Sequence, residues 1–195
     1  MNLSADAGGY PEITTERLRL RGFCDTDAKA VAGLAGHRDV AATTLAIPHP
    51  YPRREADRWI ESHHQAFVAG EGISLAITLR EDGQLVGAIG LSLDGEHRKA
   101  ELGYWIGREF WGRGYATEAA AAMLEYGFEV MELNRIYAHH MQENQASGRV
   151  LVRIGLEPEG ILREHVLKWG EYKDLVLYGL TRGRYRSPAR IEAES

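Results

Sequence analysis

The ten residues Glu109–Glu118, EFWGRGYATE, constrain the fold more than any other stretch of this chain. Two glycines flank Arg113 directly after an apolar run, and a segment rich in helix-forming residues follows. Glycine permits the backbone of a tight turn. A glycine-rich turn from a strand into a helix also presents free backbone N–H groups and the positive end of the helix dipole to an anion. The stretch therefore predicts a strand, a turn and a helix, with either a purely structural turn or an anion site between them.

The pattern of apolar residues predicts a mixed α/β domain, of the α+β type, with a largely antiparallel sheet. Alternation of apolar and polar residues predicts strands, and Asp82-Gly83 signals a hairpin turn between two of them. The expected strands are Leu18–Gly22, Ile73–Arg80, Leu85–Leu93, Ala100–Ile106, Arg135–Met141, Leu156–Leu167 and Tyr172–Leu180. Helical spacing and capping residues predict helices. These are a short helix from the possible caps Asp25 and Asp27 to about Arg38, then Arg53–Ala69, Thr117–Val130 and Gln145–Ile154.

The length of 195 residues fits one domain. We expect residues 1–14 to form a loose, flexible leader and residues 182–195 to form a frayed C-terminal tail. The domain itself then spans residues 15–181.

Composition excludes several classes of protein. With 23 Lys and Arg against 28 Asp and Glu, the net charge of -5 argues against a nucleic-acid binder. Cys24 is the single cysteine, so an internal disulfide or a cysteine metal cluster is excluded, and a reducing compartment is expected. His63-His64 and His139-His140 are adjacent pairs whose side chains diverge, so no metal site is expected. There is no signal-like N-terminus and no apolar run near the roughly 20 residues of a membrane span, which together predict a cytoplasmic protein.

Two common phosphate-binding motifs do not fit the glycine turn. The chain has no GxxxxGK[ST] loop, and the antiparallel strands expected before the turn do not suit a Rossmann unit. The segment Gly112–Ala116 could still admit a bulky pyrophosphate close to its backbone, with Arg113 as a charged donor. An ordinary glycine turn with a solvated arginine remains the open alternative.

The stretch ELGYWIGREFWGRGYATEA at 101–119 resembles the acetyl-CoA-binding segment of the GNAT family of N-acetyltransferases, especially the RimJ/RimL-like branch that acetylates N-termini of ribosomal proteins. TERLRLR at Thr15–Arg21 and Asn144-x-x-Ser147 followed by VLVRIGL stand in the same order as in that branch. The resemblance covers residues 15–181. The wider family has Gln or Arg at the position of Trp111, whereas a tryptophan there is similar to the RimJ/RimL-like branch.

This resemblance implies the GNAT fold, in which the central strands of a mostly antiparallel sheet splay apart between flanking helices. It also implies acetyl-CoA as the co-substrate and no metal. The pyrophosphate would lie on the backbone of residues 111–117 and on Arg113, and the pantetheine arm would pair like an extra strand with Tyr104–Ile106. The implied cofactor-binding residues are Tyr104, Trp105, Ile106, Trp111, Gly112, Arg113, Gly114, Tyr115, Ala116, Thr117, Asn144 and Ser147.

Glu101 is the candidate general base for the attacking amine, because it lies on the strand expected to carry the cofactor. The alternative is an ordinary strand carboxylate paired with Arg98 or Lys99. Glu164 and His165, on a later strand, are reserve candidates for the same role.

The resemblance implies that Ser147 donates to the leaving thiolate. Many members of the wider family use a tyrosine near this place, and this chain has no tyrosine between residues 138 and 171. In the RimJ/RimL-like branch a serine after the asparagine would fill the role. The alternative is a helix N-cap, because Asn144 and Ser147 open a short helix and both residue types cap well. The resemblance favours a hydrogen bond from the side chain of Asn144 to the cofactor.

The sequence thus predicts an acetyl-CoA-dependent N-acetyltransferase acting on a primary amine, with the N-terminal amine of a protein favoured. A small-molecule acceptor such as an antibiotic or polyamine, and a non-catalytic acyl-CoA sensor, remain open. The loop Thr43–Pro52 and the final hairpin are expected to line the acceptor pocket. No nucleic-acid or membrane partner is expected, and a homodimer is left open.

Overall fold

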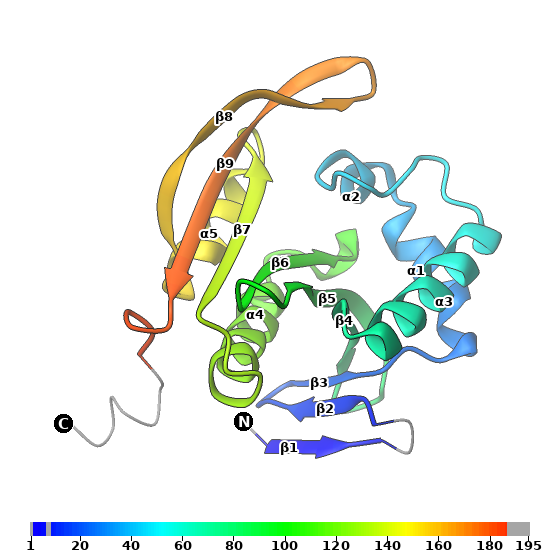
Figure 1. Cartoon of the computed structure of the whole chain (residues 1–195). Coiled ribbons are helices and arrows are strands. Elements are labelled where there is room, and N and C mark those ends of the chain that lie inside the picture. Colours follow the sequence, from blue (N-terminus) through cyan, green and yellow to red (C-terminus); the bar gives the residue numbers. More distant parts are fainter. Residues whose placement is uncertain (1, 7–8, 187–195) are drawn as a thin grey trace.

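A single sheet of nine strands forms the frame of the molecule (Figure 1). The computed structural model describes residues 2–6 and 9–186. The strands follow the order β1-β2-β3-β4-β5-β6-β7-β9-β8, and within the described chain every neighbouring pair is antiparallel except β6 and β7. The strands are β1 Asn2–Ala5, β2 Pro11–Thr14, β3 Leu18–Arg21, β4 Gly72–Leu79, β5 Leu85–Asp94, β6 Lys99–Ile106, β7 Arg135–Met141, β8 Glu157–Lys168 and β9 Glu171–Thr181. The predicted mixed α/β architecture is confirmed.

Helices cover both faces of this sheet. They are α1 Ala28–Ala35, α2 Arg38–Ala42, α3 Arg53–Ala69, α4 Tyr115–Glu125 and α5 Gln145–Arg153, and a π-helical turn, Tyr126–Val130, continues α4. α1 and α3 pack on β4 and β5, whereas α4 packs on β3, β5 and β6, and α5 packs on β7 and β8. None of the described helices is long and apolar enough to cross a membrane.

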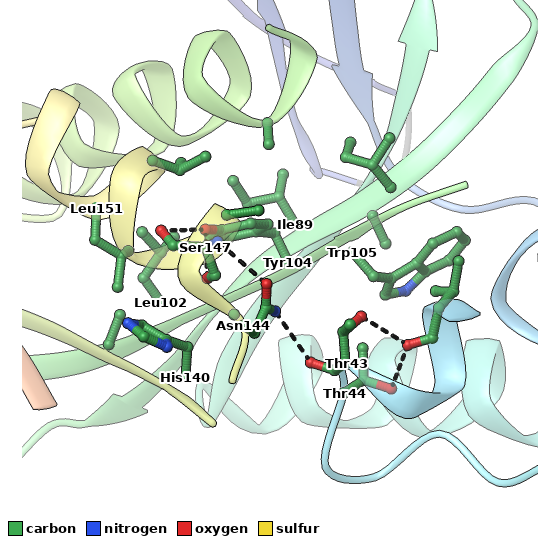
Figure 2. A pocket seen from close by; sticks show the side chains of 18 of the residues that line it. Thr43, Thr44, Ile89, Leu102, Tyr104, Trp105, His140, Asn144, Ser147 and Leu151 are labelled. Carbon is green, nitrogen blue, oxygen red and sulfur yellow. Dashed lines mark hydrogen bonds between the residues drawn. The ribbon is translucent and has the colours of Figure 1, made fainter. Parts of the chain in front are cut away.

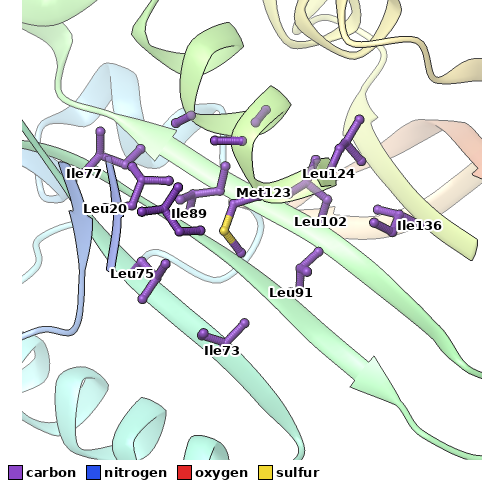
Figure 3. Close-up of a cluster of buried hydrophobic side chains, with 14 of the residues drawn as sticks. Leu20, Ile73, Leu75, Ile77, Ile89, Leu91, Leu102, Met123, Leu124 and Ile136 are labelled. Carbon is purple, nitrogen blue, oxygen red and sulfur yellow. The ribbon is translucent and has the colours of Figure 1, made fainter. Parts of the chain in front are cut away.

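Each face of the sheet has its own apolar core, and β6 contributes to both. Leu102 and Ile106 belong to the larger cluster, which is built around Met123 of α4 (Figure 3). Trp105 belongs to the smaller cluster with Val31 of α1 and Ile60 of α3. Since side chains alternate along a strand, even-numbered residues of β6 face α4 and odd-numbered residues face α1 and α3.

The strands β6 and β7 separate soon after they meet. Their parallel pairing joins only Lys99–Glu101 to Arg135–Tyr137. Beyond these residues β6 stays paired with β5 up to Ile106, while β7 pairs with β9 up to Met141. The predicted splay of the central strands is therefore present, and it opens the sheet at its middle.

The prediction of a loose leader over residues 1–14 is wrong for the described part of that segment. β2 pairs with β3 and with β1, and Ile13 is fully buried. Tyr10 is also buried, and its ring stacks on Phe67 of α3 with centroids 3.9 Å apart. Two strands of four residues are too short to give a clear alternation, so the sequence pattern missed them.

The predicted tail also begins later than expected. Arg182 donates a hydrogen bond to the carbonyl oxygen of Phe128, and Tyr185 stacks on the Phe128 ring with centroids 4.7 Å apart. The packed domain therefore continues past residue 181. Residues 187–195 of the predicted tail lie outside the described residues.

The first helical segment differs from its predicted form. A 3-10 turn over Asp25–Asp27 leads into α1, and α2 is a separate helix. Asp27 does not cap the helix with its side chain. Its buried carboxylate accepts hydrogen bonds of 2.7 and 2.9 Å from the guanidinium of Arg21, which fixes this turn to β3.

Candidate active site

A cavity of about 560 Å³ occupies the gap between the splayed strands. β6 and β7 form two of its walls, the starts of α4 and α5 form a third, and the loop after α2 closes the opposite side. Every residue predicted for the cofactor site or for Glu101 and Ser147 lines this cavity except Arg113. The fold thus brings together residues that lie up to 46 positions apart, from Glu101 to Ser147.

The glycine turn forms one end of the cavity. Gly112 has φ 76° and Gly114 has φ 82°, so both adopt the left-handed backbone that side-chain-bearing residues avoid. Gly114 is the N-cap of α4, and the first amides of the helix have no partner within it. A Cβ atom on Gly112 would have no heavy atom within 4 Å, so the space over the turn is open. The turn therefore has the shape and polarity of an anion site.

Arg17, at the entry to β3, holds this turn in place. Its Nε donates to the Glu118 carboxylate at 2.7 Å, and its Nη1 donates to the carbonyl oxygen of Arg113 at 2.9 Å. The hydroxyl of Thr15 donates to the same carboxylate at 2.6 Å. Burial alone would raise the pKa of Glu118, but the hydrogen bonds from Thr15 and Arg17 outweigh it and lower that pKa. In the sequence, TERLRLR supported the family resemblance but indicated no role for Thr15 or Arg17.

The pairing of β6 decides which of its backbone groups face the gap. The N–H of Gly107 donates to the carbonyl oxygen of Val86 at 2.8 Å, and Trp105 pairs with Ala88 of β5. In an antiparallel pair, alternate residues direct their backbone groups to the same neighbour. The backbone groups of Trp105 therefore point to β5. The prediction that they pair with the pantetheine arm is wrong for this residue.

Tyr104 and Ile106 direct their backbone groups to the open side by the same alternation. The carbonyl oxygen of Ile106 already accepts a hydrogen bond of 2.7 Å from the indole nitrogen of Trp111. A strand-like ligand in the gap would thus meet both backbone groups of Tyr104 and the N–H of Ile106. An amide-bearing ligand can pair with such an unpaired edge.

Glu101 lies on the face of β6 that looks toward α1 and α3. Its carboxylate is 3.3 Å from Nδ1 of His139, which lies on β7 across the gap. Neither expected partner is used, because Lys99 pairs with Asp94 and Arg98 pairs with Glu132. In the sequence, His139 stood out only as one of two adjacent histidines that do not suit a metal site. The strand pairing that brings it to Glu101 was not visible there.

Asn144, rather than Ser147, caps α5. The side-chain oxygen of Asn144 accepts a hydrogen bond of 3.2 Å from the backbone N–H of Ser147, and its amide group donates to the carbonyl oxygen of Thr43 at 3.5 Å. The hydroxyl of Ser147 instead lies 2.8 Å from the hydroxyl of Tyr104 (Figure 2). The capping alternative for Ser147 is therefore wrong, and its side chain is directed to the cavity wall.

His140, on β7, also lines the cavity and is 5% exposed. Its Nδ1 is 2.8 Å from the carbonyl oxygen of Met141, while its Nε2 is buried without a hydrogen-bond partner among the described residues. A Cβ atom on Gly148 would lie 2.7 Å from that Nε2. Glycine at this position therefore lets α5 approach β7 closely.

Three predicted candidates lie away from the cavity. Arg113 is exposed, with its guanidinium over the ring of Phe110 at 5.6 Å, so any contact with an anion would need a change of rotamer. Glu164 and His165 are exposed on β8, and neither lines the cavity. The geometry thus leaves Glu101 as the candidate base.

The loop after α2 forms the side of the cavity opposite the glycine turn. Residues 43–47 line it, together with Trp59 and His63 of α3, as the prediction for the loop required. The β8–β9 hairpin does not line the cavity directly. Its Lys168 is buried, and Nζ donates to the carbonyl oxygens of Ile47 at 3.0 Å and Leu45 at 3.3 Å. Burial lowers the pKa of Lys168. The hairpin therefore acts on the cavity by holding this loop.

The described part of the chain has no evident metal-binding site. No group of three or more His, Cys, Asp or Glu side chains there could hold a metal ion. Glu101 is the one carboxylate among the described residues that line the cavity.

Comparison with known proteins gives consistent matches over most of the chain. A sequence model of the acetyltransferase (GNAT) domain matches residues 17–157. The uncharacterized N-acetyltransferase YoaA of Bacillus subtilis is 31% identical over 176 residues, which cover 90% of this chain and 99% of YoaA. The ribosomal protein uS5-alanine N-acetyltransferase of Escherichia coli is 29% identical over 180 residues, covering 87% of this chain and 90% of that enzyme.

The solved structures include a similar protein in complex with CoA-disulfide. RimJ of Mycobacterium smegmatis in complex with CoA-disulfide superposes with a TM-score of 0.80 at 25% identity, over 91% of this chain and 88% of RimJ.

Proposed function

Because this chain belongs to the GNAT family of acetyltransferases, we propose that it transfers an acetyl group to a primary amine, and in particular to the N-terminal amine of a protein. GNAT acetyltransferases use acetyl-CoA, which supplies an acetyl group activated as a thioester. The chain itself has to bind this donor, deprotonate the amine and stabilise the sulfur that leaves.

The open edge of β6 supports acetyl-CoA as the donor, together with the glycine turn at the end of the same cavity. Tyr104 offers a backbone N–H and C=O for an amide-bearing arm. The turn offers the free amides at the start of α4 for a pyrophosphate. Asn144, at the start of α5, also lines the cavity, where it would hydrogen-bond the same arm as it enters the gap.

Glu101 and Ser147 lie on opposite sides of β6, which supports a separate role in the reaction for each of them. Glu101, on the face toward α1 and α3, would take the proton from the ammonium group of the acceptor, directly or through a water molecule. Ser147, on the face toward α4 and α5, would donate a hydrogen bond to the sulfur while the carbon–sulfur bond breaks. As the amide forms, the nitrogen also loses its second proton, which reaches the departing sulfur through water. The nitrogen then carries the acetyl group, and CoA leaves as its thiol.

Glu101, the one carboxylate that the described residues bring to the cavity, is the observation that carries the choice of acceptor. A polyamine brings several ammonium groups, each of which needs a counter-charge or water when it is buried. An N-terminal amine brings only one, which Glu101 can meet. The ribosomal protein acetyltransferases among the relatives support the same choice, and such an acceptor would place the reaction in the cytoplasm.

An acceptor panel tests this proposal. We expect the protein and acetyl-CoA to release thiol rapidly with peptides that begin in a free alanine or serine, and not with the same peptides acetylated at the N-terminus. Thiol release with spermidine but with none of the peptides would exclude a protein acceptor, while the assignment as an acetyltransferase would stand. Binding of acetyl-CoA without any amine-dependent release would instead indicate the non-catalytic sensor.

Glu101→Gln tests the assignment of the base. Its rate should fall most at a pH below the pKa of the acceptor amine and should recover in part in alkaline buffer, where the amine is already deprotonated. The pH profile of turnover measures this. Ser147→Ala is the control, because its loss should not depend on pH in the same range. A Glu101→Gln profile parallel to that of the wild type would exclude Glu101 as the base.

A further inference from the structure

Tyr104 places a second hydroxyl beside Ser147. The phenol oxygen is 2.8 Å from Oγ of Ser147 and 3.4 Å from the backbone carbonyl oxygen of the same residue. The ring of Tyr104 packs against the core on the α4 side, and both residues line the cavity (Figure 2). This contact joins β6 to the first turn of α5 across the gap in the sheet.

Either hydroxyl could donate in this hydrogen bond, and the chemistry of the two groups favours donation by the phenol. Burial raises the pKa of Tyr104 to about 12, although the hydrogen bond with Ser147 acts in the opposite direction. The phenol therefore keeps its proton at neutral pH, and the closest acceptor for that proton is Oγ of Ser147. Asn144 engages the backbone N–H of Ser147 and not its hydroxyl. The serine proton is then free to point into the cavity.

We propose that Tyr104 is a positioning residue, which donates to Ser147 and thereby directs the serine hydroxyl at the sulfur of the departing CoA. This inference rests on the proposed acetyl transfer. When the carbon–sulfur bond breaks, its electron pair stays on sulfur and accepts the hydrogen bond from Ser147. Tyr104 keeps its own proton throughout, and the first proton from the amine leaves by way of Glu101. No oxidant, metal or further reactant is needed.

Tyr104→Phe removes only the phenol oxygen and retains the ring that packs in the core. We expect kcat to fall about tenfold, the effect of one lost hydrogen bond near 1.4 kcal/mol, while KM for acetyl-CoA changes less than about twofold. Tyr178→Phe is a matched control. It removes a phenol oxygen from β9, on the His140 side of α5, where no hydrogen bond to Ser147 is made. It should keep the wild-type kcat.

The double variant separates positioning from an independent role. If Tyr104 acts through Ser147, then Tyr104→Phe should lower kcat of Ser147→Ala by less than about twofold. A further tenfold loss in the double variant would overturn the proposal, as would a wild-type kcat in Tyr104→Phe.

A second measurement needs no acceptor. The thiol of bound CoA can be titrated by its ultraviolet thiolate absorbance, with the free protein subtracted because of Cys24. We expect its pKa to rise by about one pH unit in both variants relative to wild type, since Ser147→Ala removes the donor to the thiolate and Tyr104→Phe removes the contact that directs it. An unchanged thiol pKa in Tyr104→Phe would overturn the positioning role. Failure of the proposed function would appear differently, as wild-type protein that binds CoA but acetylates no amine.

Discussion

Asn144 and Ser147 stand three positions apart at the start of α5, and hydrogen bonding gives them different roles. The carboxamide of Asn144 satisfies a free N–H group of the helix, whereas the hydroxyl of Ser147 contacts Tyr104 in the cavity. The sequence alone could not decide which of the two residues caps the helix, since both types occur at helix N-termini. Asn144 therefore caps the helix in addition to its place in the cavity lining, whereas the hydroxyl of Ser147 is left for a catalytic role.

Alanine substitutions at these two positions should have different consequences. Asn144→Ala should lower the free energy of unfolding by about 1 kcal/mol, the value of a lost cap, and Tm by about 2–4 °C. Ser147→Ala should melt close to the wild type but turn over about tenfold to a thousandfold more slowly, with little change in acetyl-CoA affinity. Thermal melting and steady-state kinetics measure both. A Ser147→Ala protein with normal turnover and a lowered Tm would remove Ser147 from the mechanism.

At the scale of elements, α4 depends on a strand that is almost a hundred residues away. The carboxylate of Glu118, in the first turn of α4, accepts hydrogen bonds from the backbone and side chain of Arg17 and from Thr15. These contacts fix the glycine turn against β3. The glycine turn is thus anchored to the sheet and is not a free loop.

Glu118→Gln should show how this junction responds to pH. The pKa of Glu118 in the folded protein lies below its ordinary value of 4.5. The ionised carboxylate therefore stabilises the fold above that value, and the stabilisation is lost as the pH falls through the lower, folded-state pKa. In urea denaturation the variant should be less stable than wild type by a constant amount at neutral pH, and the difference should shrink in acid below pH 4.5. Glu109→Gln, at an exposed position just before the turn, is the control. A difference that persists unchanged down to pH 3, roughly, would contradict this role of Glu118.

The elements themselves were largely predictable from local pattern. β4, β6, β7, α3 and α5 begin and end within about two residues of the ranges that periodicity predicts, in keeping with the usual uncertainty of boundaries. The short strands β1 and β2 were not predicted, because four residues show too little periodicity to indicate a strand. The contacts of Tyr104 with Ser147 and of Glu101 with His139 were not predicted for another reason. They join positions about 40 residues apart, and only the pairing and splay of the strands bring them together.

At the scale of the whole molecule, one buried lysine ties the C-terminal hairpin to the N-terminal half. Lys168, at the end of β8, donates to the carbonyl oxygens of Leu45 and Ile47, more than 120 residues earlier. The hairpin extends beyond β7 toward the region of α2 (Figure 1). The same loop lines the side of the cavity proposed for the acceptor, so the position of this loop depends on a residue outside the cavity.

Lys168→Met should therefore affect the acceptor more than the donor. Loss of both hydrogen bonds frees the loop, and KM for the acceptor peptide should rise about tenfold, while KM for acetyl-CoA stays within about twofold. Steady-state kinetics with each substrate varied in turn measures this. Arg163→Met, at an exposed position of the same hairpin, is the matched control and should leave both values unchanged. Equal increases in both KM values would point to general loosening of the fold.

The three-residue junction between β6 and β7 also determines how the sheet opens. Hydrogen bonding across the middle of the sheet is interrupted beyond Glu101 and Tyr137, although apolar packing continues from one side to the other. In the absence of ligand, the amide protons of Tyr104 and Ile106 face the gap and have no strand partner, so they should exchange with solvent while those of β5 remain protected. A bound pantetheine arm would supply the missing backbone hydrogen bonds, and it would join the two half-sheets into one cooperative unit. The co-substrate would then serve for the duration of each turnover as a tenth strand.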